Sequence, residues 1–577
     1  MRLFLWPCLC QAAADLNLVP DWDHAPFLHG VASADPLETQ VLIWTRVSNA
    51  GLDTEVLWGL WSEGGRESFE HPLRRGRQLA TASSDFTVSV DVTGLRPGSR
   101  YLYQFSVGRN RSMLGHTRTA SNDSQVDLAI LSCTSLWSGF FNFYRQLAVE
   151  DLDAVVHVGD LVYERPDPDE LLRVPDLHCD EDQEVSPLQA PGIVMDSLRD
   201  ALCSSSDSVR YRALHSVHMF DPDFRLARSK HPFIVIYDNH DINWRNANSS
   251  LHAFREWVPM RASSGDAGSY RHFHFGNNLL DLFLLDTTAS ASKDSLLGEE
   301  QHDWLGEQLM NSSGAWRLFA SPKTFMPLTL NRIGVSLAVP VAGIALLLLL
   351  QLICCRLLAR SFTRRQAEQQ DLLDLPGNEL YSAGRPAMAA QKMVRCCSVC
   401  AQCIFWLWLL VGVVTCILLF VKLDKRPGLN LLHASRTTWE GHPRSREALF
   451  EQLRQSGKTS NNIWAVGDMH FSYIADVFHF DYQGQDLLSY HPGTSSPERF
   501  GVEFMPGSGS RGNMDEKAYE LLGVLFRPPS LLSRLMSRVV DYVMLSANPH
   551  VRHFEGSDHG YGLLRITPQQ VQASWVR

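Results

Sequence analysis

Polar side chains of the kinds that bind metal ions follow four apolar runs of this sequence, at the point where each run ends. In chain order they are Cys133, Asp160, Tyr163, Asn239, His240, Asp468 and His470. Their donor atoms are sulfur, carboxylate, phenol and amide oxygen, and imidazole nitrogen. This mixture suits a transition metal such as iron beside a divalent metal that prefers oxygen. The pattern therefore predicts a metal centre.

Each of these residues also has an ordinary explanation when it is taken alone. A Gly-Asp pair such as Gly159-Asp160 is a common turn at a strand end, and a lone Cys is usually a small buried hydrophobe. A single His is usually a surface or core residue. The metal centre is favoured because the residues form an ordered set on successive strand ends.

The elements that must position these residues are strands of an α/β sheet. The apolar runs predicted as strands are 128–133, 154–160, 233–238, 280–286, 316–320 and 463–468. Continuous apolar runs are typical of strands covered on both faces. Helices are predicted at 140–149 and 299–309. The carboxyl ends of such strands face a shared crevice, where α/β proteins place their sites.

The first part of the chain has a different pattern. Residues 27–120 contain short runs that alternate apolar and polar residues, at 41–47, 87–92 and 101–107, and a turn at 94–98. This alternation predicts an antiparallel β-sandwich. The fold class expected for the chain is therefore α/β, with an N-terminal β-sandwich followed by a larger α/β sandwich.

Two further windows are strongly apolar. Residues 333–355 and 404–421 carry no charged side chain, and each is long enough to cross a bilayer as a helix of roughly 20 residues. A buried core helix is the alternative. The two apolar windows predict a transmembrane hairpin, residues 331–433. This hairpin would interrupt the α/β domain and divide it into residues 126–330 and 434–577. The lipid bilayer is then a partner.

The flanks of the two spans predict the orientation. The connection between them is rich in Arg and Lys, which places it in the cytoplasm. The chain would be a multi-pass membrane protein whose large segments are extracellular or lumenal. The sequons at Asn110, Asn122, Asn248 and Asn311 agree, because all lie in the segment predicted to be outside.

The N-terminus and the cysteines add to this interpretation. Residues 1–20 are typical of a short secretory signal, and a misassigned start is the alternative. Cys179 and Cys203 form a candidate disulfide. The cysteines near the predicted membrane edges, at 354–355 and 396–403, favour S-palmitoylation over zinc binding, because no second ligand pair follows.

Composition excludes other classes of protein. The chain has 52 Lys and Arg residues against 63 Asp and Glu residues, a net charge of −11, whereas nucleic-acid binding normally needs a basic surface. Its 15 Trp and 28 Phe residues supply ample core material, which argues against disorder.

The ordered motifs resemble those of the PhoD-like alkaline phosphatases, a branch of the metallophosphatases. The resemblance covers most of residues 27–330 and 434–577. The motifs that carry it are Phe27–Pro36, Ile43–Arg46, Leu131–Cys133, Val158–Glu164, Tyr237–Asp241, Leu297–Leu305, Trp439–Pro443, Gly467–His470, Asn548–His550 and Gly560–Tyr561. It implies a metallophosphatase-type α/β sandwich and a phosphate ester as the substrate.

The resemblance also implies a ligand set. Iron would be held by Cys133, Asp160, Tyr163 and His470. Calcium would share the bridging Asp160, with Asn239 and Asp468 as further ligands, in a dinuclear or larger centre. Glu440 and Asn243 are two more candidate oxygen ligands.

The implied activity is hydrolysis of a phosphate ester. Two cations about 3.5 to 4 Å apart would neutralise the phosphoryl oxygens. Asp160 and His240 are the predicted catalytic residues, His240 as a proton donor or substrate stabiliser, with a structural role in orienting the ligand loop as its alternative.

The chain departs from the family's pattern at two places. It reads Asp238-Asn-His-Asp241 where the family commonly has Asp-Asp-His-Glu, and Thr288 replaces an Arg. These departures leave open a non-catalytic surface or adhesion protein on a phosphatase scaffold. A small channel subunit ranks last, because the apolar spans carry no charge that would mark an ion path.

Overall fold

The computed structural model of the chain describes residues 18–48, 51–164, 201–243, 246–262, 269–292, 294–328, 438–480, 490–491, 498–513, 516 and 531–577. The chain divides into two compact units. The first comprises Met1–Pro327, Leu432–Asp541 and Pro549–Arg577, and the second comprises Leu328–Leu431 and Tyr542–Asn548. The three sheets described below belong to the first unit, as do all the described helices except the end of α12 (Leu531–Ala547).

An eight-stranded sheet carries the first part of the predicted α/β domain. Its strands, in spatial order, are β20 (Val571–Val576), β19 (Tyr561–Ile566), β9 (Val126–Leu131), β10 (Ala154–Val158), β11 (Pro232–Ile236), β1 (Val31–Ala34), β2 (Gln40–Arg46) and β5 (Thr87–Thr93). The four central strands β9, β10, β11 and β1 are parallel. Their carboxyl ends therefore meet at one edge.

A seven-stranded sheet carries the second part. Its strands, in spatial order, are β12 (Arg271–Phe275), β13 (Leu280–Leu284), β14 (Trp316–Ser321), β15 (Asn462–Val466), β17 (Arg499–Pro506), β16 (Ser472–Phe478) and β18 (Val551–Glu555). The strands β13, β14, β15 and β17 are parallel. The strands on either side of the undescribed segment 329–437, β14 and β15, are direct neighbours, with Phe319 opposite Trp464.

The two sheets pack face to face through one buried cluster. Its members are inward-pointing side chains of both sheets, among them Leu128, Val156, Ile234, Leu282, Leu318 and Ile463. On the opposite face of the second sheet, the rings of Phe283, Phe319 and Trp464 stack in a row at 5.4 and 5.0 Å between centroids. Both faces of these strands are buried, which explains why the runs are apolar without alternation.

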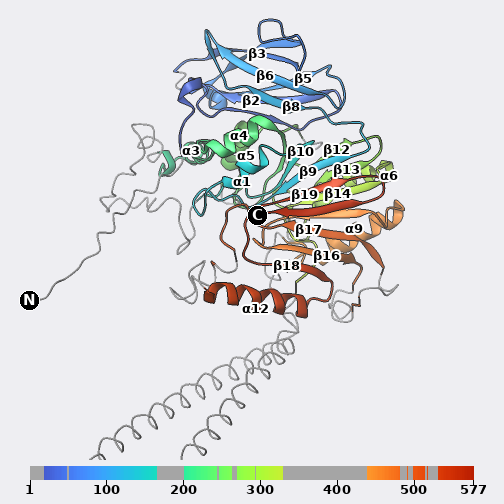
Figure 1. Ribbon diagram of the computed structural model, residues 1–577. Helices are drawn as coiled ribbons and strands as arrows, with labels where there is room; N and C mark the ends of the chain where they lie inside the picture. Colours follow the sequence, from blue (N-terminus) through green and yellow to red (C-terminus); the bar gives the residue numbers. More distant parts are fainter. Residues whose placement is uncertain are drawn as a thin grey trace, which may run out of the picture. The chain divides into compact units, whose positions relative to one another are not determined.

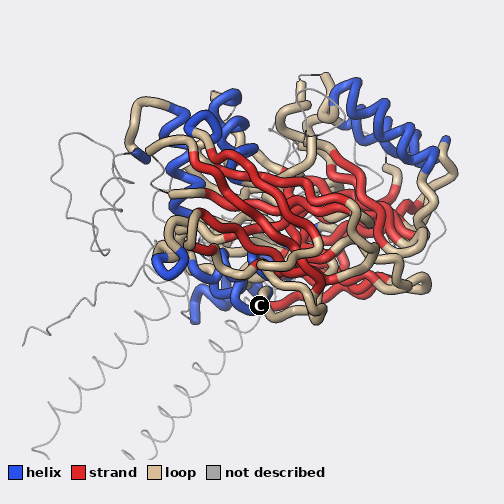
Figure 2. Tube along the Cα trace, turned by 90° about the horizontal axis from the view of Figure 1, so that it is seen from above, coloured by secondary structure: helices blue, strands red, loops and turns tan. Residues whose placement is uncertain are grey.

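Helices cover the outer faces of the stacked sheets (Figure 2). Helices α1 (Asn142–Leu147), α3 (Asp207–His218), α4 (Pro222–Lys230) and α5 (Ala247–Trp257) lie together beside the eight-stranded sheet (Figure 1). They share a second buried cluster with its strands. Helices α6 (Gly298–Asn311) and α9 (Pro443–Gln455) lie beside strands of the seven-stranded sheet (Figure 1). The predicted strands, and helices near 140–149 and 299–309, are confirmed.

The predicted fold class needs a first correction at the N-terminus. The sheet-forming residues of 27–120 are not a self-contained β-sandwich, because β1, β2 and β5 are part of the eight-stranded sheet and β1 pairs with β11. The remaining strands form a third sheet: β4 (Arg74–Ala80), β3 (Thr54–Ser62), β6 (Arg100–Val107), β7 (Asn110–Arg111) and β8 (Gly115–Arg118). A buried cluster that includes Ile43, Val56 and Tyr103 joins it to β2 and β5. The fold is thus a mixed α/β, sheet-rich structure with one shared sheet.

The second correction concerns the membrane hairpin. Among the described residues, no helix has both the length and the apolar character needed to cross a bilayer. The two predicted spans, 333–355 and 404–421, lie outside the described residues. The multi-pass membrane localisation and the bilayer as a partner are therefore not supported.

The described part of the chain also contains other predicted features. The sequon residues Asn110, Asn122, Asn248 and Asn311 are all exposed, and their glycosylation stays a prediction. Cys203 is disulfide-bonded, but its predicted partner Cys179 lies outside the described residues. The cysteines at 354–355 and 396–403 and the first 17 residues of the predicted signal also lie outside them.

Candidate metal centre

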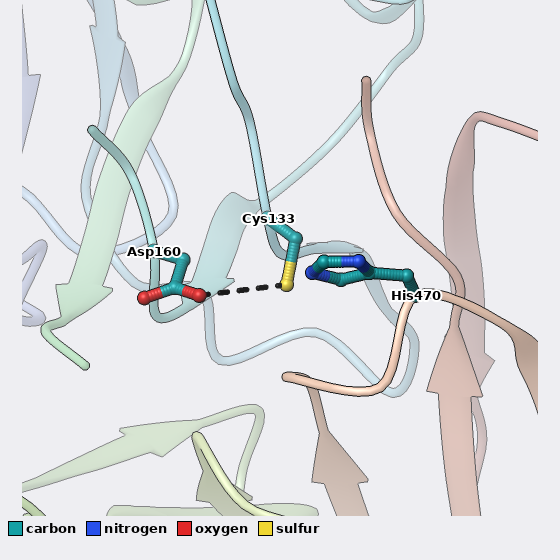
Figure 3. Close-up of side chains that lie close together, drawn as sticks. All are labelled: Cys133, Asp160 and His470. Carbon is teal, nitrogen blue, oxygen red and sulfur yellow. Dashed lines mark hydrogen bonds between the residues drawn. The ribbon is translucent and has the colours of Figure 1, made fainter. Parts of the chain in front are cut away.

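Three of the predicted iron ligands meet where strands of the two sheets end. Cys133 follows β9, Asp160 follows β10 and His470 follows β15. One potential ligand atom from each lies within 4.8 Å of the others. Figure 3 shows the sulfur of Cys133 between the carboxylate of Asp160 and the imidazole of His470. The sulfur lies 4.0 Å from Asp160 Oδ2.

Tyr163 joins the same group from the loop after Asp160. Its hydroxyl donates to Asp160 Oδ2 at 2.9 Å and lies 3.4 Å from His470 Nε2. The other imidazole nitrogen, Nδ1, lies 3.0 Å from the Gly512 carbonyl oxygen, which only accepts. In the neutral ring Nδ1 therefore carries the proton and Nε2 has the lone pair, the arrangement in which histidine binds a metal. All four residues predicted as iron ligands are thus brought together.

The backbone at these positions is unusual. Cys133, Asp160, Asp468 and His470 all have left-handed φ angles, of 57°, 55°, 75° and 58°. Residues other than glycine rarely adopt this conformation, and each instance costs of order 1 kcal/mol or more. Such strain persists where the surrounding structure holds the chain in a functional geometry. Four instances among the predicted ligands mark this as a site.

Gly159 allows the two loops to approach each other. Its φ is +100°, and an added Cβ would lie 2.7 Å from the Cβ of Asp238 and 3.1 Å from that of Pro322. Only glycine combines this dihedral angle with this close approach. The Gly-Asp pair is therefore a requirement of packing as well as of ligand placement.

Burial disfavours the deprotonated, anionic forms of Cys133 and Tyr163. Burial, followed by the nearby carboxylate of Asp160, raises the pKa of the Cys133 thiol and of the Tyr163 phenol above their usual ranges. Both side chains are fully buried. A bound cation reverses this preference, since it deprotonates a coordinating thiol outright.

A second group of oxygens lies on the other side of Asp160. Oxygens of Asp160, Asp238 and Asp468 come within 4.8 Å of one another. The Lys323 ammonium lies among them: Nζ is 2.7 Å from Asp238 Oδ2, 2.5 Å from Asp468 Oδ1 and 2.6 Å from Asn239 Oδ1. The predicted calcium ligands Asn239 and Asp468 thus both contact a lysine, which the sequence patterns did not single out.

The charges in this group depend on one another. Burial opposes the charge of Lys323, but Asp238, Asp468 and Asp160 outweigh it and raise the pKa of Lys323 above its usual value. Burial also raises the pKa of Asp238, to about 7. The oxygens are therefore crowded enough to require a positive neighbour.

His240 lies beside the iron group as a charged residue. Its Nδ1 contacts Glu164 Oε2 at 2.9 Å, and its backbone N–H donates to Asp160 Oδ1 at 3.2 Å. Burial favours the neutral ring, but the carboxylates of Asp160 and Glu164 outweigh it and raise the pKa of His240 to about 9. His240 is therefore protonated at neutral pH.

The two departures from the family pattern have structural roles. Asp241 accepts the backbone N–H groups of Asp238, at 2.9 Å, and of Val162, at 3.0 Å, so it joins the two ligand loops. Thr288 donates from Oγ1 to Asp238 Oδ1 at 3.0 Å.

The guanidinium of Arg511 lies 4.4 Å from the ring centroid of Tyr163 and supplies a buried positive charge.

The remaining candidates are less central. Glu440 pairs with Arg446 at 3.4 Å and is not in either ligand group. Asn243 follows the Asp241 loop and its ligand role stays a prediction. The sequence did not predict Lys323 or Arg511 as site residues, and it assigned no role to Glu164, the partner of His240. The only sequence feature that could have indicated them is their place in the chain: Lys323 follows strand β14, and Glu164 follows Tyr163.

Comparison with known proteins identifies the family of the chain. The PhoD-like phosphatase family matches residues 128–575, and the N-terminal domain of the PhoD-like phosphatases matches residues 11–121. Alkaline phosphatase D of Bacillus subtilis (strain 168) is 28% identical over 356 residues, which are 53% of this chain and 58% of that protein. The match thus spans less than two thirds of the relative.

A solved structure of PhoD has the same fold. It superimposes with a TM-score of 0.61 at 20% identity, over 96% of this chain and 87% of the solved one. Because the family match covers most of the sequence and includes all the strand ends that carry the site, the chain belongs to the PhoD-like phosphatase family.

Proposed function

We propose that this protein is a metal-dependent phosphoric ester hydrolase whose active site is the cluster of Cys133, Asp160, Tyr163 and His470. The observation that carries the proposal is the convergence of these side chains from separate strand ends, with three ligand atoms within 4.8 Å. Membership of the PhoD-like family supports the reaction class.

Iron fits the cluster by the chemistry of its donors. Sulfur, phenol oxygen, imidazole nitrogen and carboxylate oxygen form a mixed set that suits a transition metal. The buried Cys133 thiol and Tyr163 phenol need a cation beside them to lose their protons. The hydrogen bond of His470 Nδ1 to Gly512 orients the ring as outer partners of metal ligands do.

Calcium fits the second group less well. The oxygens of Asp160, Asp238 and Asp468 are the hard ligands that calcium takes. The ammonium of Lys323, however, lies 2.5 to 2.7 Å from Asp468, Asn239 and Asp238. We therefore assign no catalytic step to calcium.

The chain's own residues account for much of the chemistry. Iron, when bound, would supply the Lewis acidity that stabilises charge on a phosphoryl group. Lys323 and Arg511 add positive charge at the same place, which favours an anionic substrate. His240, protonated by virtue of Asp160 and Glu164 and 31% exposed, would give a proton to the leaving alcohol.

The direct test is hydrolysis by purified protein of a generic phosphomonoester and a phosphodiester, with iron content measured on the same samples. We expect hydrolysis of at least one ester in proportion to bound iron, and a visible charge-transfer band from iron bound to the Tyr163 phenolate. The comparison of the two esters would define the substrate class. Iron-replete protein that hydrolyses neither ester would contradict the proposal.

A matched pair of variants links activity to this site. Tyr163→Phe removes the phenol oxygen and keeps the ring under Arg511, so it should abolish the visible band. Tyr542→Phe, at a half-exposed tyrosine on α12, is the control and should keep the band. Retention of the band in Tyr163→Phe would place any iron elsewhere.

A further inference from the structure

Lys323 is a buried cation with a full set of oxygen partners. Its side chain is 2% exposed. The ammonium group has three donor hydrogens, and three oxygens lie within hydrogen-bonding distance: Asp468 Oδ1 at 2.5 Å, Asn239 Oδ1 at 2.6 Å and Asp238 Oδ2 at 2.7 Å. Each donor can therefore be used. These acceptors come from the loops after β11 and β15, and Lys323 itself follows β14.

The same oxygens would have to hold a second metal ion. Asp160, the carboxylate shared with the iron cluster, lies with Asp238 and Asp468 in one group of possible ligands. Calcium needs six to eight oxygen ligands at about 2.3–2.6 Å. The Lys323 nitrogen contacts two of these carboxylates, Asp238 and Asp468, and also Asn239, at 2.5 to 2.7 Å, which is close to a calcium–oxygen bond length. A calcium ion and the ammonium cannot occupy this place together.

The backbone of Lys323 is fixed on both sides. The Ser321 hydroxyl donates to the Lys323 carbonyl at 3.1 Å and accepts from the Trp439 indole at 3.1 Å. The Pro322 carbonyl accepts the Gly467 N–H at 3.1 Å. Pro322 also lies where a side chain on Gly159 would be. The lysine is thus built into the junction between the strand ends, and its withdrawal would leave the buried carboxylate of Asp238 without this cation.

We propose that the Lys323 ammonium takes the place of the second metal ion, so that this phosphatase works with one metal ion per active site and binds no calcium there. The inference rests on the proposed function. The lysine keeps one fixed positive charge against Asp238 and Asp468, whereas a bound ion dissociates. The positive charge at this place is then independent of the calcium concentration, and iron is the one cation of the proposed centre that can dissociate.

The test compares the whole protein with Lys323→Gln, in which the charge is lost and a carbonyl oxygen is added on a side chain that is one bond shorter. Calcium binding is measured by titration calorimetry and by metal analysis after desalting, in the parent and in an Asp468→Asn background. We expect no Asp468-dependent calcium binding in the parent protein, and about one calcium ion per chain in Lys323→Gln. Chelation of calcium should leave the activity of the parent unchanged.

Activity provides a second measurement. Without calcium, Lys323→Gln should lose activity by on the order of a hundred-fold, because a charge next to the phosphoryl group is gone. Calcium should restore at least about a tenth of it. Lys458→Gln, a lysine just beyond the end of α9, is the matched control and should bind no calcium. Lys323→Arg, which keeps the charge, should also bind none.

Two results would overturn the inference. One is Asp468-dependent binding of calcium by the parent protein. The other is a folded Lys323→Gln protein, judged by its retained iron, that takes up no calcium. Both are read from metal content, so they differ from failure of the proposed function, which would appear as lack of hydrolysis in iron-replete protein.

Discussion

The two halves of the site share Asp160 but balance their charges differently. On the iron side, Cys133, Asp160 and His470 bring three possible ligand atoms within 4.8 Å of one another, and the Tyr163 hydroxyl lies 3.4 Å from His470 Nε2. This arrangement suits a cation that comes from solution. On the lysine side, Lys323 contacts Asp238, Asn239 and Asp468 directly. One half is built to receive a cation and the other already contains one.

The difference has a simple electrostatic basis. An ammonium and a divalent ion about 3.5 Å apart repel each other by roughly 9 kcal/mol at an effective dielectric constant of ~20. This repulsion opposes a metal ion beside a covalently attached cation that already contacts the same oxygens. On the iron side, the positive groups of His240 and Arg511 lie against the ring of Tyr163, at 4.3 and 4.4 Å from its centroid.

The largest expected effect is that of the residue common to both halves. Asp160 accepts from Tyr163 and from the His240 backbone and borders both ligand groups. Asp160→Ala should lose iron and reduce ester hydrolysis by on the order of a thousand-fold or more. Metal analysis and kcat/KM on the same preparation would measure both. Asp53→Ala, at an exposed position, is the control, and normal iron content in Asp160→Ala would remove Asp160 from the ligand set.

The next effect separates the halves. Cys133→Ser replaces sulfur with a harder oxygen and should weaken iron binding by about ten-fold or more. Asp468→Asn should keep its iron, because Asp468 does not belong to the group of Cys133, Asp160 and His470. Its hydrolysis should fall by on the order of ten-fold, since Lys323 loses an anionic partner. Equal loss of iron in both variants would show that the halves are one indivisible centre.

The sequence predicted the iron side because its residues have ligand-type chemistry at strand ends. Each of them follows a run that is apolar on both faces, and parallel strands bring such ends to one edge. The left-handed conformations of Cys133, Asp160 and His470 were not predictable, since they depend on contacts between loops that are distant in the chain.

The lysine side was only partly predictable. Asn239 and Asp468 were recognised as oxygen ligands, but Lys323 follows its strand in the sequence Ser-Pro-Lys, which resembles no ligand pattern. The pairing of β1 with β11 was also not predicted, because it joins residues far apart in the chain: Ser33 lies opposite Pro232. The alternation of apolar and polar residues in 27–120 indicates which residues form strands, but not which strands pair. Local patterns specify strands, whereas the partners of a strand depend on packing across about 200 residues.

A smaller effect tests the proton donor beside the iron half. Glu164→Gln removes an anion 2.9 Å from His240 Nδ1 and so lowers the His240 pKa from about 9, by roughly 1 unit for a half-exposed pair. The charged ring of His240 would donate the proton, so activity should decrease as the pH rises through the pKa of His240. In Glu164→Gln this decrease should occur at a lower pH than in the parent protein. The pH–rate profile of kcat/KM measures this. Glu55→Gln, at an exposed glutamate, is the control, and an unchanged alkaline limb would exclude His240 as the donor.

The smallest effect concerns the residue that stands where the family usually has an arginine. Thr288 donates to Asp238 Oδ1, while Lys323 holds Oδ2. Thr288→Val keeps the shape but leaves one oxygen of a buried carboxylate with a partner fewer, at a cost of about 1 to 2 kcal/mol in the free energy of unfolding. Thr288→Ser keeps the hydroxyl and should be nearly neutral. Iron content should be normal in both variants, because Asp238 belongs to the lysine half. Loss of iron in Thr288→Val alone would show that the carboxylate of Asp238 couples the two halves.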